Sequence, residues 1–123
     1  GKAALAREIL ENALAAEWAP QLVALYGETP EGSSAEARVQ EARARIERAE
    51  RWLLERNRDA QLLATLGRLC AQAELWGKAR SFLEASLSFE ESRAARVELA
   101  RLAERLGESD EAQRHFRRAA ELS

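Results

Sequence analysis

The chain has 123 residues, of which 46% are hydrophobic and 33% are charged, and this length fits one domain with a moderate core. The formal net charge of -2, from 19 basic and 21 acidic residues, argues against nucleic acid as the main partner, because phosphate binding needs a basic excess on one surface. A single cysteine excludes an internal disulfide. No apolar run approaches the roughly 20 residues of a membrane span.

Two helices are predicted before residue 27. Apolar residues at spacings of three and four give residues 2–16 one apolar face. Pro20 interrupts this pattern, but proline is tolerated in the first turn of a helix. We therefore expect a short second helix that begins near Ala19 and is closed by Gly27, followed by a loop over residues 27–33. The apolar residues expected to anchor this segment are Trp18, Leu22, Val23, Leu25 and Tyr26.

A long third helix is predicted from Ser33 to about Arg56. Ser33, followed three residues later by Glu36, forms a capping box that satisfies backbone N–H groups at the helix start. Pairs such as Glu41 with Arg45 are expected to be solvated ion pairs on the outer faces. The apolar seam, which lets a neighbouring helix come close, consists of Ala35, Val39, Ala42, Ile46, Ala49 and Leu53.

The second half of the chain contains one pattern twice, so that Gly67 in the first copy returns as Ala100 in the second. Each copy has two apolar stripes separated by a break, which predicts two short helices joined by a turn. The small residue lets the paired helices approach, while Leu83 and Phe116 are expected to fill the space beside the contact. The other matching pairs are Leu66 and Leu99, Leu69 and Leu102, Cys70 and Ala103, Ala79 and Ala112, and Ser86 and Ala119.

These elements predict an all-α fold, an antiparallel helix-pair array of about seven helices in a single domain over residues 1–123. Residues 1–58 form degenerate N-terminal helices, and residues 59–91 and 92–123 form the two repeats. Asp59 is the expected N-cap of the first repeat. The helices of the repeats are expected near 60–73, 76–89, 92–106 and 109–122, with the first break at 75–77 and the second at 107–110.

No catalytic centre is evident in the sequence, and an enzyme is not expected. One histidine, one cysteine and no methionine give neither a metal-ligating cluster nor a Ser-His-Asp or Cys-His set. We expect His115 to be a surface or half-buried side chain rather than a metal or heme ligand, and Cys70 to be a small buried hydrophobe. Trp18, Trp52 and Trp76 are expected to anchor the core rather than line a pocket. We therefore expect no metal and no cofactor.

The stretch from Asp59 to Ser123 resembles a tetratricopeptide repeat, on the strength of Leu66-Gly67, Ala79, Leu83 and their counterparts. This resemblance implies a right-handed superhelix in which the first helix of each repeat lines a concave groove. The residues that it places on this inner surface are Gln61, Ala64, Thr65, Arg68, Gln72, Val97, Glu98, Arg101, Glu104 and Arg105. The partner-binding candidates among them are Gln61, Thr65, Arg68, Gln72, Glu98, Arg101 and Arg105.

Arg68 and Arg101 hold equivalent places in the two repeats. Stacked repeats would set their guanidinium groups side by side, in a geometry suited to a carboxylate or a chain terminus. Alternatively, the two arginines pair with Glu98 and Glu104 and have no further role. The lysines and asparagines with which the family clamps C-terminal carboxylates are absent from these positions, so that function is not carried over.

Several phrases from Trp18 onward are similar to the C-terminal region of the HemY family, bacterial inner-membrane proteins associated with the late steps of heme biosynthesis. The resemblance implies a longer protein with two N-terminal membrane helices, of which this chain, starting at Gly1 rather than methionine, would be the soluble end. The matching phrases are Leu22-Val23, Leu25-Tyr26-Gly27, Ala49-Glu50-Arg51-Trp52-Leu53, Leu66-Gly67-Arg68-Leu69-Cys70 and Leu75-Trp76-Gly77-Lys78-Ala79-Arg80.

The function expected from this resemblance is protein binding, in which the groove holds an enzyme or transporter of the porphyrin pathway. A first alternative is direct tetrapyrrole binding or carriage, with arginines receiving the propionates and His115 or an apolar crevice holding the ring. A second alternative is self-association through the open ends of the array, which would give a homo-oligomer.

Overall fold

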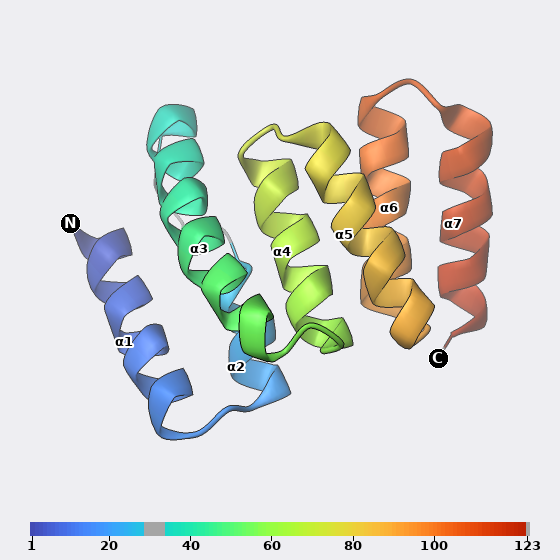
Figure 1. Cartoon of the computed structure of the whole chain (residues 1–123). Helices are drawn as coiled ribbons and strands as arrows, with labels where there is room; N and C mark the ends of the chain where they lie inside the picture. Colours follow the sequence, from blue (N-terminus) through green and yellow to red (C-terminus); the bar gives the residue numbers. More distant parts are fainter. Residues whose placement is uncertain (29–33, 123) are drawn as a thin grey trace.

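The computed structural model describes residues 1–28 and 34–122. These residues form seven α-helices arranged as an array, with the two ends of the chain at opposite ends of it (Figure 1). The all-α helical array predicted from the sequence is confirmed, whereas the right-handed sense of its superhelix stays a prediction. The helices are α1 (Lys2–Ala16), α2 (Pro20–Tyr26), α3 (Ala35–Glu55), α4 (Ala60–Gln72), α5 (Trp76–Phe89), α6 (Arg93–Arg105) and α7 (Ser109–Glu121).

Capping side chains explain where several helices begin. Asp59 and Ser92 hold equivalent positions in the two repeats, and each accepts a hydrogen bond from the third following N–H, at 3.0 and 3.2 Å. Ser34 caps α3 in the same way at 3.1 Å, while Ser33, the cap expected from the sequence, lies outside the described residues. Pro20 occupies the first turn of α2, as predicted.

Each repeat is a helical hairpin, α4 with α5 and α6 with α7 (Figure 1). Gly67 explains how closely α4 and α5 approach, because a Cβ atom built there would lie 2.5 Å from Leu83 Cγ and 3.2 Å from the Ala79 carbonyl oxygen. Leu83 and Ala79 are both fully buried beside it. The predicted close contact at Gly67 is therefore confirmed.

The turns inside the two hairpins have the same backbone form. Glu74 has a φ of 62° and Gly107 a φ of 76°, and in each copy the next N–H, of Leu75 or Glu108, donates back to the end of the first helix at 2.8 Å. This is the Schellman arrangement that closes a helix through one left-handed residue. Gly77, which the sequence placed in the first break, lies instead in the first turn of α5.

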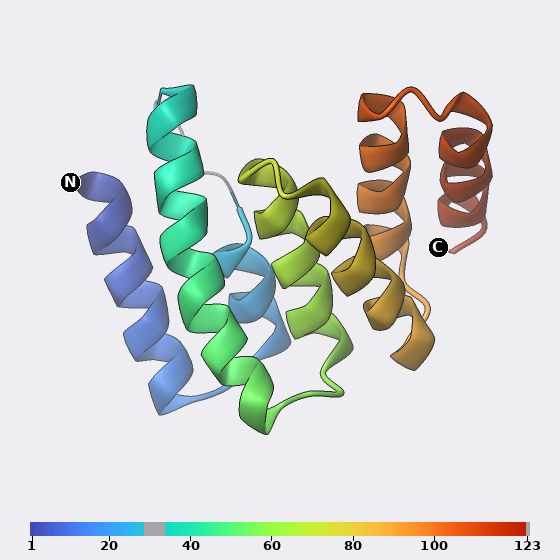
Figure 2. The ribbon, with the colours of Figure 1, turned by 45° about the horizontal axis from the view of Figure 1, so that its top comes forward.

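The ends of the array leave apolar side chains exposed. Phe116 is 38% exposed, although the repeat pattern predicted that it would fill the core as Leu83 does. That prediction was wrong because α6 packs against α5, whereas no described helix covers the outer face of α7 (Figure 2). At the other end, Leu5 and Ile9 of α1 are exposed, and only Leu14 of that helix is buried.

Buried charges join α1 and α2 to α3. The side chains of Glu41 and Arg45 form an ion pair at 2.8 Å and are both buried, which contradicts the expectation of a solvated pair. Arg7 of α1 donates to the same carboxylate at 3.0 Å, and Arg45 also donates to the backbone oxygen of Tyr26 at 2.9 Å. The pair is buried because helices distant in the sequence cover this face of α3.

Aromatic side chains complete the N-terminal packing. The ring centroids of Trp18 and Trp52 lie 5.3 Å apart, and those of Tyr26 and Trp52 lie 4.9 Å apart, both in edge-to-face arrangements. Trp18 donates its indole N–H to Asp59 at 3.0 Å. The predicted anchoring role is thus confirmed for Trp18, Leu22, Val23 and Tyr26, but it was wrong for Leu25, which is 44% exposed because it lies on the outer side of α2. Across the described helices, none has an apolar stretch long enough to cross a membrane.

Candidate functional site

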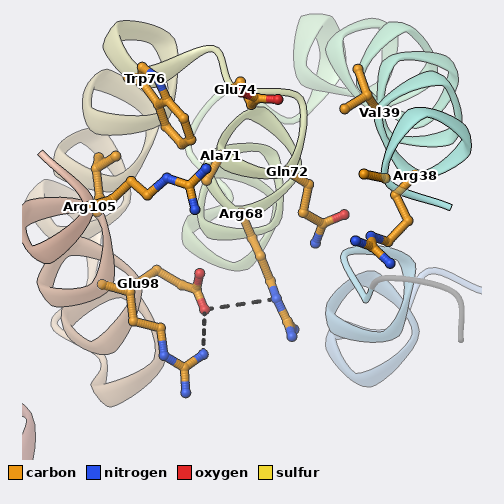
Figure 3. Close-up of a pocket in the computed structure, with 12 residues that line it drawn as sticks. Arg38, Val39, Arg68, Ala71, Gln72, Glu74, Trp76, Glu98 and Arg105 are labelled. Carbon is orange, nitrogen blue, oxygen red and sulfur yellow. Dashed lines mark ion pairs between the residues drawn. The ribbon is translucent and has the colours of Figure 1, made fainter. Parts of the chain in front are cut away.

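A concave surface runs along α4 and α6, and we call it the groove. It comprises two hollows, of about 440 Å³ and about 250 Å³, which share Arg68, Glu98 and Arg101. Figure 3 shows the first hollow. Its other lining residues are Ala35, Arg38, Val39, Ala71, Gln72, Glu74, Trp76, Leu102 and Arg105. The second hollow is completed by Ala24, Gln61, Ala64, Thr65, Arg93, Ala94 and Val97.

All seven partner-binding candidates named from the sequence line the groove. Gln61 and Thr65 line the second hollow, and Gln72 and Arg105 line the first. Glu104, which the repeat pattern also placed on the inner surface, lines neither hollow. That these residues bind a partner stays a prediction.

Glu98 pairs with both equivalent arginines of the repeats, Arg68 and Arg101, and Figure 3 shows its carboxylate directed at Arg68. One of its carboxylate oxygens, Oε2, is 3.8 Å from Arg68 Nε and 3.5 Å from Arg101 Nη1. The Glu98 side chain is 19% exposed, against 38% for Arg68 and 64% for Arg101. Both separations exceed a charge-assisted hydrogen bond, so the two pairs are loose and the guanidinium groups face the open groove.

Polar side chains of α4 build one wall of the groove by fastening the α2 segment to it. The Thr65 hydroxyl donates to the Val23 carbonyl at 3.0 Å, and the Gln72 amide donates to the Gly27 carbonyl at 2.8 Å. Thr65 is buried, and Gln61 donates to its hydroxyl at 3.3 Å. These residues therefore shape the groove, since their polar atoms are already engaged within the chain.

Trp76 lines the first hollow, where Arg105 of α6 lies over its ring, 5.2 Å from the centroid. The sequence predicted Trp76 as a core anchor, and it is partly buried against the core as well. The pattern alone did not reveal its second role, because the partner of its exposed face comes from the next repeat. Arg38 and Val39 were missed for the same reason, since α3 reaches the groove only through tertiary packing.

The groove carries a local excess of positive charge. Among the described residues other than Arg38, its two hollows are lined by four arginines, Arg68, Arg93, Arg101 and Arg105, and by two acids, Glu74 and Glu98. These arginines outnumber the acids by two, on a chain whose formal net charge is -2. A concave surface lined by one sign of charge concentrates ligands of the opposite sign.

Comparisons with known proteins do not place the chain in a family. Protein-family models, curated proteins and solved structures gave no significant match.

His115 lies away from the groove, in a third hollow of about 160 Å³ between α5, α6 and α7. Its Nδ1 is 3.2 Å from Arg96 Nη1 and its Nε2 is 3.1 Å from Glu111 Oε1. Arg96 also binds Glu91 at 2.6 Å, and this hydrogen bond holds the pKa of the Glu91 carboxyl below its usual value. His115 is half-buried, as expected. Among the described residues, no group of three or more His, Cys, Asp or Glu side chains is placed to hold a metal.

Proposed function

We propose that this chain is a protein-protein interaction module that holds a segment of a partner protein in the groove. The observation that carries the proposal is the continuity of two hollows along α4 and α6, joined at Arg68, Glu98 and Arg101. A continuous concave surface of this kind accommodates an extended or helical segment. The arginines supply charge-assisted hydrogen bonds and the apolar walls supply contact area.

The similarity to the HemY C-terminal region extends this proposal. In this interpretation the module is the soluble part of a protein anchored in a bacterial inner membrane by segments outside this chain. Its partner is then an enzyme or transporter of late heme biosynthesis. We also propose that the chain has no catalytic role, because its one histidine and one cysteine offer neither a Ser-His-Asp nor a Cys-His set.

A photo-crosslinking experiment tests the groove as the interaction site. A crosslinking amino acid at Ala94, which lines the second hollow, is compared with the same group at Ser81, an exposed position on α5 that lines no hollow. In cells that make the protein, we expect a crosslinked partner from Ala94 and not from Ser81. The double variant Arg68→Gln/Arg101→Gln should lose it while keeping the melting temperature of the parent. Equal crosslinking from both positions contradicts the proposal.

Self-association is a second candidate, because exposed apolar side chains occur at both ends of the array. Leu5 and Ile9 are 57% and 59% exposed at one end, and Leu106 and Phe116 are 43% and 38% exposed at the other. Sedimentation over a range of protein concentrations measures this directly. A dimer that Ile9→Lys or Phe116→Lys disperses would favour it.

Direct tetrapyrrole binding has less structural support. The form in which His115 holds the ring needs His115 and the groove arginines in one site, yet His115 lines a different hollow from Arg68 and Arg101, so only the form with an apolar crevice is compatible with the groove. Hemin titration separates the ideas. We expect no saturable absorbance shift, whereas a shift abolished by His115→Ala or Arg68→Ala would favour tetrapyrrole binding.

A further inference from the structure

One carboxylate of the groove itself, that of Glu98, occupies the place between the two matched arginines, Arg68 and Arg101. Glu98 is more buried than either Arg68 or Arg101 and lies 3.8 and 3.5 Å from their nearest nitrogens. A guanidinium group has five N–H donors in a planar fork and forms its strongest contacts bidentately at about 2.7 to 2.9 Å. One carboxylate at these longer distances leaves most of that donor capacity directed at the groove.

The first hollow also has an apolar part. Trp76, Ala71 and Leu102 contribute to its walls, and Val39 of α3 lies across the hollow from Trp76 (Figure 3). Its volume of about 440 Å³ lies within the range of roughly 300 to 1,000 Å³ in which proteins bind small ligands or side chains. An apolar side chain inserted there would bury the exposed part of Trp76, and Trp and Arg are the residue types that most often dominate binding energy.

The charge of the groove decides between two classes of macromolecule. Arginines beside a tryptophan also suit single-stranded nucleic acid, which binds through phosphates and stacked bases. Glu98 and Glu74, however, lie among the arginines and would repel a phosphate backbone, and the chain as a whole is acidic. A peptide has fewer and more localised negative charges, so it can place carboxylates at the arginines and keep neutral groups opposite the two glutamates.

Resting on the proposed function, we infer that the groove binds an internal acidic peptide segment with one bulky apolar side chain, and that Glu98 occupies the place of a ligand carboxylate. The apolar side chain fills the hollow beside Trp76. The flanking carboxylate binds Arg68 and Arg101 and displaces Glu98 from between them. Glu98 is thus a built-in competitor that lowers the affinity for the segment.

The decisive experiment measures fluorescence anisotropy of a labelled peptide with a central leucine flanked on both sides by glutamates and blocked at both ends. We expect Glu98→Gln to tighten binding about threefold or more, because it removes the competing charge, and Arg68→Gln/Arg101→Gln to weaken it about tenfold or more. Glu55→Gln, an exposed change on α3, and Arg114→Gln/Arg117→Gln on α7 are matched charge controls. Both controls should bind like the parent.

The peptide itself supplies the remaining controls. Replacing its glutamates by glutamines should abolish binding, and replacing its leucine by alanine should weaken it about fivefold or more. If Glu98→Gln weakens binding or leaves it unchanged, Glu98 orders the arginines instead of competing, and the inference is wrong. Tighter binding of labelled oligouridine than of the acidic peptide would overturn it in favour of nucleic acid.

The two proposals fail in different ways. If the peptide does not bind, but the partner crosslinked at Ala94 is still lost from the double arginine variant, the groove is an interaction site for a different ligand class. If the peptide binds as expected and no partner is crosslinked, the acidic specificity of the groove holds and the proposed cellular role does not.

Discussion

The two repeats differ most in how deeply they bury the side chains at equivalent positions. Leu83 is fully buried while its counterpart Phe116 is 38% exposed, and Ala73 is 3% exposed while its counterpart Leu106 is 43% exposed. The first hairpin has neighbours on both sides, α3 and α6, whereas the second has a described neighbour on one side only. The position of a repeat in the array therefore decides how far its side chains are buried, as expected where each repeat packs only against its neighbours and stability is a sum over adjacent units.

The repeats also differ in where each uses glycine. In the first, Gly67 lies at the contact between the helices and Glu74 takes the left-handed turn position; in the second, the equivalent Ala100 is fully buried and Gly107 takes the turn. Glycine at the contact permits closer approach at a cost in helix propensity. Glycine at the turn removes the steric cost of a left-handed residue. Glycine thus relieves the close helix contact in the first repeat and the left-handed turn in the second.

The largest effect should come from truncating the matched large side chains. Leu83→Ala removes a fully buried side chain between α4 and α5, and we expect it to lower the free energy of unfolding by about 3 to 5 kcal/mol. Phe116→Ala should cost only about 1 to 2 kcal/mol, because part of the ring is already in water. Urea unfolding monitored by circular dichroism measures both. Equal losses would show that Phe116 is covered by a second molecule in solution.

The next largest effect is expected at the contact between α4 and α5. The prediction is tested by whether a substitution there raises or lowers the free energy of unfolding. Gly67→Ala improves helix propensity, but the new methyl group would collide with Leu83 and the Ala79 carbonyl. We therefore expect a net loss of about 1 to 2 kcal/mol. Ala100→Gly should cost about 1 kcal/mol through propensity and lost packing. A stabilised Gly67→Ala variant would mean that the two hairpins have the same spacing.

The helices and their pairing could be predicted from the sequence because the signals are local. The 3.6-residue periodicity, the cap at Asp59 and the proline at the start of α2 act within one or two turns of chain. The repeat added the close contact at Gly67, since small residues at fixed offsets have a purely steric meaning. The groove residues on α4 and α6 followed from the resemblance to a tetratricopeptide repeat, which places the first helix of each repeat on the inner surface.

Contacts between residues that are distant in the sequence were not predicted. An i,i+4 pair such as Glu41 and Arg45 has the same sequence pattern whether it is solvated or buried, and its burial here depends on α1 and on Tyr26. Trp76 lines the groove beside Arg105, which comes from the next repeat. Arg38 lines it because α3 reaches the groove through tertiary packing. Left-handed geometry at Glu74 was hidden because the nearby Gly77 offered the more conventional residue for a turn.

A smaller effect should follow from exchanging the turn residues. Glu74→Gly relieves the left-handed conformation without removing a buried contact, and we expect it to stabilise the protein by about 0.5 to 1 kcal/mol. Gly107→Ala imposes that conformation on a side chain and should cost about 1 kcal/mol. Thermal melts of the two variants should therefore shift in opposite directions. A Glu74→Gly variant that melts lower would show that this side chain contributes more than its backbone costs.

The last effect concerns the matched pair Cys70 and Ala103, and it depends on pH. Burial raises the pKa of the Cys70 thiol from 9.0 to about 11. The folded protein therefore keeps the proton where the unfolded chain loses it, and the associated stability is fully present below about pH 9 and is lost as the pH rises towards 11.

Cys70→Ala, which copies the second repeat, removes this dependence. The difference in unfolding free energy between parent and variant should shrink from pH 8 to pH 10, whereas Ala103→Ser, which adds no thiol, should show a constant difference over the same range. A parent-variant difference for Cys70→Ala that does not change with pH would show that the thiol ionises as easily in the folded repeat as in the unfolded chain.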